Sequence, residues 1–252
     1  MGRPCENITV TNCTMLDGHG GVVIGSEMSG GVRRVAISNC IFDGTERGIR
    51  IKTTRGRGGA VEDIRVSNVV MTRIKSAPFD LNMFYQKTPE EPVSERTPVL
   101  RNMHFSDITV KDSPAAGFIL GLAEMPVDNV TFSNLAIEAE KGFSCSNARN
   151  IAFRNVRINT KKGPALIGEN LQDLEVDGFR TLTPHDNCAV IDLKNASVAY
   201  VHDCIAASGT GAFLGLRGPS TRDILLQNND LRQAGSPVQT TEGCPPSAVI
   251  QN

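Results

Sequence analysis

One short phrase recurs along almost the whole sequence. It reads apolar-x-apolar-x-Asn, then two residues and another apolar residue, as in "ENITVTNCTM", "RRVAISNCIF" and "RNIAFRNVRI". Successive anchor positions lie 21 to 39 residues apart, and repeats of 20 to 50 residues are typical of solenoids. The phrase therefore predicts a chain of stacked, similar units. The anchors are Asn12, Asn39, Asn68, Asp107, Asn134, Asn155, Gly178, Asp203 and Asn228.

A second phrase falls between the anchors and is typical of short strands. It begins with a small residue and continues with alternating apolar residues, as in "GVVIGS", "GIRIKT" and "GFILGL". Two strands per repeat, joined by turns rich in Gly, Asn and Ser, predict an all-β parallel β-helix of about nine coils, with residues 1–252 as one domain. The leucine-rich horseshoe requires an L-x-x-L-x-L frame and a helix per repeat, and the sequence has neither.

Stacking of the coils predicts a structural role for the anchor residues. Asparagines at one corner of successive coils can hydrogen-bond to one another. The seven cysteines form no C-x-x-C pair, which argues against a metal site and favours buried free thiols. The sequence suggests no cofactor.

The step from Asn68 to Asp107 is the longest, at 39 residues, and contains "FYQKTPEEPVSERTP". Three prolines and many polar residues exclude a ladder strand. We therefore predict a protruding loop over residues 83–98, either as the wall of a cleft or as an inert insertion.

Composition excludes some classes of partner. The formal net charge of -1 gives no drive toward nucleic acid or membrane surfaces. No apolar run approaches a membrane span, and the start "MGRPCENITV" has no signal-peptide pattern. We expect a monomer.

Alignment of the first three short strands by their inward residues predicts one polar surface. Arg50 and Lys52 point outward from neighbouring positions, Asp80 follows Arg50 on the next coil, and His19 lies at the turn before the first strand, in line with Arg47. Two cations on one face are either an ordinary solvated surface, with Asp80 pairing with Arg50, or a site for carboxylates.

These residues resemble the motifs of glycoside hydrolase family 28, the polygalacturonases. The run "NCTMLDGHGGVVIGS" resembles the family's Gly-His-Gly signature and "RGIRIK" its Arg-Ile-Lys motif. The resemblance is strong over residues 2 to about 113. It implies a right-handed parallel β-helix that hydrolyses α-1,4-galacturonide or related pectin linkages with inversion, outside the cell or in the periplasm. By the same resemblance, His19 assists the catalytic carboxylates, Arg50 and Lys52 bind the substrate carboxylate, and Tyr85 contacts the substrate.

The family's two acidic motifs, Asn-x-Asp and Asp-Asp, are not found before Gly-His-Gly. The sequence has no Asp-Asp, and its single Asn-x-Asp lies at residues 228–230. Inverting hydrolysis needs a carboxylic acid and a carboxylate base. The nearby acids are weak substitutes, and the abrupt start of the first coil suggests truncation at the N-terminus, so we expect the chain to be inactive alone. The alternatives are a non-catalytic pectin-binding β-helix and a lyase. The nearby acids are Asp17, Glu27, Asp43, Glu46 and Asp80.

Overall fold

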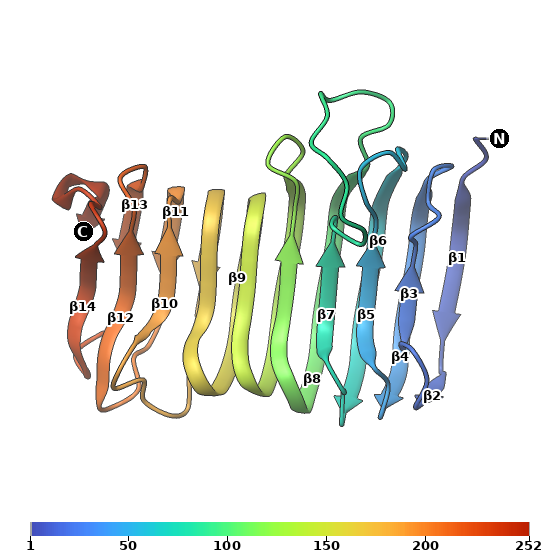
Figure 1. The fold of residues 1–252 in the computed structure, drawn as a ribbon. Coiled ribbons are helices and arrows are strands. Elements are labelled where there is room, and N and C mark those ends of the chain that lie inside the picture. Colours follow the sequence, from blue (N-terminus) through green and yellow to red (C-terminus); the bar gives the residue numbers. More distant parts are fainter. Residues whose placement is uncertain (1, 252) are drawn as a thin grey trace.

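The computed structural model describes residues 2–251 as a parallel β-helix of about nine coils, which confirms the predicted fold class (Figure 1). The coils lie side by side along a rod, with the first coil at one end and the last at the other. The strands are β1 (Cys5–Thr11), β2 (Thr14–Leu16), β3 (Val22–Ile24), β4 (Val32–Asp43), β5 (Arg47–Lys52), β6 (Ala60–Thr72), β7 (Ala77–Asn82), β8 (Val99–Leu120), β9 (Val127–Asp177), β10 (Ala189–Lys194), β11 (Ser197–His202), β12 (Thr210–Arg217), β13 (Arg222–Gln227), β14 (Ala234–Thr241) and β15 (Val249–Gln251); a short 3-10 helix, η1, spans Pro246–Ala248.

All nine predicted anchors turn corners of the rod. Each has a positive φ between 51° and 62°, a left-handed conformation that Asn, Asp and Gly adopt most easily. The predicted side-chain ladder forms in part. Asn68 donates to Asn39 at 2.8 Å, and Asn155 donates to Asn134 at 2.9 Å. Backbone conformation therefore accounts for the recurring anchor at every coil, and hydrogen bonding adds to it at some.

Aromatic rings form the centre of the core. Phe132 stacks on Phe105 at a centroid distance of 5.2 Å and on Phe153 at 5.1 Å, while Phe79 and Phe143 meet it edge-on. All five side chains are fully buried. Equivalent positions of successive coils hold these rings, so the inward side of the strands becomes one continuous apolar column.

The cysteines follow their predicted state in part. All seven are free, and Cys40, Cys145, Cys204 and Cys244 are buried. Cys5 is exposed, because it lies on an outward position at the start of β1.

One series of strands forms the face that concerns function. It runs β3–β5–β7 and continues through the end of β8 into β9, with every pairing parallel. We call this the site face. Residues 83–98 connect β7 to β8 without helix or strand and project from one side of the rod (Figure 1).

Candidate functional site

Strand register places two cations on the site face as alternation predicts. Ile49 and Ile51 of β5 are fully buried in the core, so Arg50 and Lys52 point the opposite way. Arg50 pairs in register with Val23 on one side and Asp80 on the other, which confirms the predicted column.

Close packing explains the glycines around His19. A Cβ on Gly21 would lie 2.4 Å from the ring of Phe42, and one on Gly25 would lie 2.0 Å from the carbonyl oxygen of Lys52. Gly25 also has a φ of +91°, a backbone conformation that residues with a side chain rarely adopt. The glycines thus let the turn and β3 pack directly against the next coil. His19 lies in this turn, just before β3.

Five side chains from three coils form a closed ring of polar contacts, which we call the polar ring. Nδ1 of His19 lies 2.6 Å from Oε2 of Glu46, and Nε2 lies 3.0 Å from Nη1 of Arg50. Nε of Arg50 lies 3.1 Å from Oδ2 of Asp80. Arg47 closes the ring, with Nε 2.9 Å from the same oxygen and Nη1 3.0 Å from Glu46.

The polar ring engages both ring nitrogens of His19. Nδ1 lies against a carboxylate oxygen of Glu46, and Nε2 lies against the guanidinium of Arg50, which can only donate. These contacts are satisfied when Nδ1 donates to Glu46 and Nε2 accepts from Arg50.

His19 was predicted to lie in line with Arg47, but it lies one residue away, beside Glu46. The pairing of Val22 with Ile49 brings His19 beside Glu46, and Arg47 lies opposite Gly20. The predicted pairing of Arg50 with Asp80 is present, and Asp80 is buried to 1% exposure between the two arginines. The role of Glu46 as a partner of His19 was missed, and strand register extended backward from β5 is the signal that reveals it.

Lys52 lies at the centre of the candidate site. Its Nζ is 4.3 Å from the centre of the Tyr85 ring, and that ring also lies 5.8 Å from the Arg50 guanidinium carbon. Lys52 is only 9% exposed, and among residues 2–251 no carboxylate lies within 4.0 Å of its ammonium group. The structure thus brings His19, Arg50, Lys52 and Tyr85 together on one surface.

The loop that carries Tyr85 is attached directly beside Lys52. The amide of Tyr85 donates to the carbonyl of Thr53 at 2.9 Å, and the Thr54 hydroxyl donates to the carbonyl of Gln86 at 3.0 Å. Arg55 is buried, contacts the ring of Phe84 and forms an ion pair with Glu124. This attachment, which the sequence did not predict, holds Tyr85 in position.

Each acid near the site is already held by a cation. Asp17 contacts Lys75 at 3.2 Å, and Glu27 contacts Arg57 at 3.3 Å. Hydrogen bonds from Arg73 and Thr72 lower the pKa of Asp43 to about 2. Glu46 and Asp80 belong to the polar ring. A general acid needs a raised pKa, and that of Asp43 is lowered instead.

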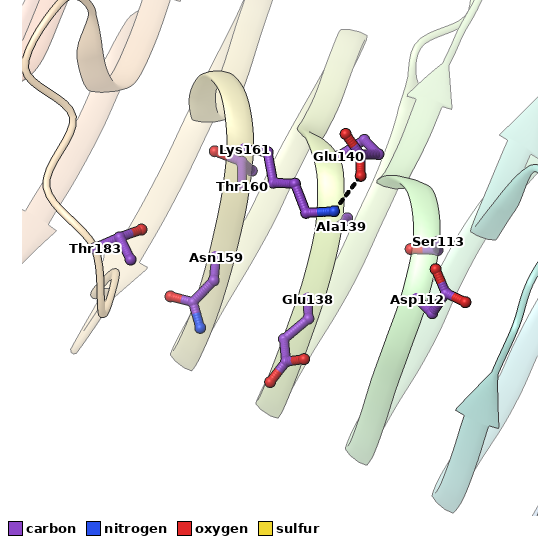
Figure 2. Close-up of a pocket in the computed structure, with 9 residues that line it drawn as sticks. All are labelled: Asp112, Ser113, Glu138, Ala139, Glu140, Asn159, Thr160, Lys161 and Thr183. Atoms are coloured by element: carbon purple, nitrogen blue, oxygen red, sulfur yellow. Dashed lines mark hydrogen bonds and ion pairs between the residues drawn. The ribbon is translucent and has the colours of Figure 1, made fainter.

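Figure 2 shows a different hollow, of about 330 Å³, at a corner several coils away. Three acids line it, Asp112, Glu138 and Glu140, and Lys161 forms an ion pair with Glu140. This lining would repel an anionic ligand, so we do not assign the site there.

A third cluster has groups that could ligate a metal ion. Ligand atoms of Glu175, Asp177 and His202 lie within 4.8 Å of one another. Arg154 already pairs with Glu175, and Asp203 contacts His202 at 2.7 Å.

Within residues 2–251, no helix is long and apolar enough to cross a membrane.

Comparison with known proteins shows that the chain is similar to polygalacturonases. It is 28% identical over 157 residues to a probable polygalacturonase of Vitis vinifera, covering 60% of this chain and 32% of that protein. It is 31% identical over 147 residues to an endo-polygalacturonase of Pectobacterium carotovorum, covering 56% and 33%. The chain thus spans about a third of the length of these curated relatives.

A solved structure gives the same result. The hyperthermoactive exopolygalacturonase from Thermotoga maritima superimposes with a TM-score of 0.57 and 29% sequence identity, covering 63% of this chain and 35% of that one. The sequence model of the family described as "Glycosyl hydrolases family 28" matches residues 2–154, more than half of the chain. The chain therefore belongs to glycosyl hydrolases family 28.

Proposed function

We propose that this chain binds galacturonate units of a pectin-type polysaccharide, as the substrate-binding part of a polygalacturonase-type hydrolase. The observation that carries the proposal is the state of Lys52. Among the described residues it is an ammonium group with no carboxylate partner, held beside an aromatic ring and an arginine. A substrate carboxylate would supply the missing partner.

In this proposal the polar ring prepares the site before substrate arrives. Asp80 fixes the guanidinium of Arg50, so its orientation costs little conformational entropy on binding. Lys52 and Arg50 together bind the carboxylate, and the Tyr85 ring packs against the sugar. His19 lines the same surface and orients Arg50 through Nε2, and it would assist the reacting groups by hydrogen bonding once Nε2 is released from Arg50.

We further propose that the chain alone binds without hydrolysing. Inversion requires two carboxyl groups about 6.5–9.5 Å apart, one of them protonated. The five acids near His19 are each paired with an arginine or a lysine, as described above. Hydrolysis by the whole protein would need two further carboxyl groups.

A pectin polymer lies outside the cytoplasm, so we propose an extracellular or periplasmic location. We also propose that the protein is a monomer.

The test is calorimetric titration of the chain with trigalacturonate. Lys52→Ala and Arg50→Ala should each weaken binding at least tenfold, since hydrogen bonds to charged groups contribute about 1.5–3 kcal/mol. Arg101→Ala is the matched control, because Arg101 pairs with Glu62 on another face. Unchanged binding in both site variants would overturn the proposed site.

A reducing-end assay on polygalacturonate tests the second part. We expect no release by the chain alone. Release of reducing ends would overturn the claim that the acids near His19 cannot substitute, and unsaturated products absorbing in the ultraviolet would indicate a lyase instead.

A further inference from the structure

Two neighbouring coils carry a cluster of metal-ligating side chains away from the site face. β11 pairs with the end of β9 on one side and with β13 on the other, in a series of strands that does not include β5 or β7. Glu175 and Asp177 alternate with the buried Val176, and Asp177 lies in register with His202. The three polar side chains therefore point outward together, and their ligand atoms lie within 4.8 Å of one another.

His202 is held in a way that leaves one ring nitrogen free. Nδ1 lies 2.7 Å from Oδ2 of Asp203, a contact that is satisfied when Nδ1 donates, and Nε2 then keeps a lone pair. Nε2 is buried and has no hydrogen-bond partner among residues 2–251. The ring of Tyr200 stacks on the imidazole at a centroid distance of 4.0 Å, and its hydroxyl donates to Gln227 at 2.8 Å. The imidazole is thus oriented from two sides, and no protein donor uses its acceptor atom.

The free nitrogen faces a carboxylate at a distance that suits a shared ion better than a hydrogen bond. Nε2 of His202 lies 3.6 Å from Oε1 of Glu175. Two ligands about 2.1 Å from a tetrahedral zinc ion lie about 3.4 Å apart. Arg154 donates to the other oxygen of Glu175, Oε2, so Oε1 stays available. Oδ1 of Asp177 lies 3.6 Å from Nδ1 of the same ring, so a rotation of this side chain brings a third ligand to the ion.

The charge of the cluster also favours a divalent cation. Neither Asp177 nor Asp203 has an arginine or lysine within 4.0 Å among the described residues, and both contact His202 instead. Three carboxylates, those of Asp177, Asp203 and Glu175, and the one guanidinium of Arg154 give a net charge of −2 around a neutral imidazole. A divalent cation would balance this charge.

We propose that Nε2 of His202 and carboxylate oxygens of Glu175 and Asp177 bind a zinc ion, with water in the remaining position. An imidazole among carboxylates suits zinc, whereas calcium and magnesium take oxygen ligands. Asp203 would act behind the ligand, as the carboxylate that fixes the histidine ring. The ion would join β9 to β11 and is independent of galacturonate binding at Lys52.

The experiment follows Co²⁺, which occupies zinc sites and is paramagnetic, by tyrosine fluorescence. The sequence has no tryptophan and two tyrosines, so Tyr85→Phe leaves Tyr200 as the single fluorescent reporter, stacked directly on the ligand ring. Titration of this variant with Co²⁺ should quench the fluorescence, and added Zn²⁺ should restore it by displacing the cobalt.

Ligand variants are made in the same Tyr85→Phe background. His202→Gln should weaken Co²⁺ binding at least tenfold, and Asp203→Asn, which keeps a side chain that other corners of the rod carry, about tenfold. His104→Gln is the matched control and should bind as the parent does. His104 is also a half-buried histidine in this series of strands, but its charged neighbours are Arg65 and Arg154.

Three results would overturn the inference. These are no quenching of Tyr200 by Co²⁺, an equal affinity of the parent and both ligand variants, and an absorption band of sulfur-to-cobalt charge transfer, which would place the ion on a cysteine. Circular dichroism of each variant verifies the fold, and Asp203→Asn keeps the test decisive if His202→Gln does not fold.

Discussion

Replacement of Asp80 by Asn tests the polar ring most directly. The side chain is 1% exposed, and Oδ2 lies 2.9 Å from Nε of Arg47 and 3.1 Å from Nε of Arg50. Asparagine keeps the shape and removes the charge, so two guanidinium groups, 17% and 11% exposed, lose their shared carboxylate. Breaking a buried pair costs about 3–5 kcal/mol. Arg47 keeps its contact with Glu46, so we expect about 3 kcal/mol.

The assay is unfolding followed by circular dichroism at neutral pH. A loss of about 3 kcal/mol should lower Tm by about 6–12 °C for a chain of this size. Asp223→Asn is the control, because Asp223 also pairs with an arginine, but both side chains are 63% exposed and such pairs contribute little. If Asp80→Asn lowers Tm no more than Asp223→Asn does, the reasoning about the buried carboxylate is wrong.

Three further outcomes follow from packing and ionisation. Phe132→Ala should lower the free energy of unfolding by about 3–5 kcal/mol, because Phe132 stacks at the centre of the core; a denaturant titration that gives less than about 1 kcal/mol would contradict this. Exposed Cys5 should react quickly with a thiol reagent, whereas burial raises the pKa of Cys145, which should be labelled only on unfolding; timed mass spectrometry distinguishes the two. The pKa of Asp43 is lowered from 3.8 to about 2, so its contribution is full above pH 3.8 and is lost as pH falls toward 2. Unfolding midpoints measured over that window should fall less for Asp43→Asn than for the wild type.

Local pattern was enough to predict the rod and the columns on its site face. Alternation in "RGIRIK" fixes which side chains enter the core, because a shift by one residue would bury Arg50 and Lys52 and expose Ile49 and Ile51. Repetition of the pattern then fixes which coils are neighbours. The position of Arg50 between Val23 and Asp80 required nothing more.

The features that the sequence pattern did not predict depend on turns and on contacts between residues distant in sequence. Alternation does not extend through the turn before β3, so it could not decide whether His19 faces Glu46 or Arg47. The Tyr85 ring beside Lys52 belongs to the loop of residues 83–98, which is attached by hydrogen bonds at Thr53 and Thr54. The anchor residues were predicted correctly as corners, but their left-handed backbone is the more general reason for them than hydrogen bonding.

The way the longest coil accommodates its extra residues has a further consequence. Residues 83–98 leave the rod and return to it, yet the register continues undisturbed from Asn82 to Leu120. An insertion at this point therefore changes what stands above the site face and leaves the spacing of Arg50 and Lys52 along it unchanged. The coils thus keep the charged side chains in place, and the loop alone determines what lies above them. Substrate selectivity could therefore be changed by grafting other loops between β7 and β8 without altering Arg50 and Lys52.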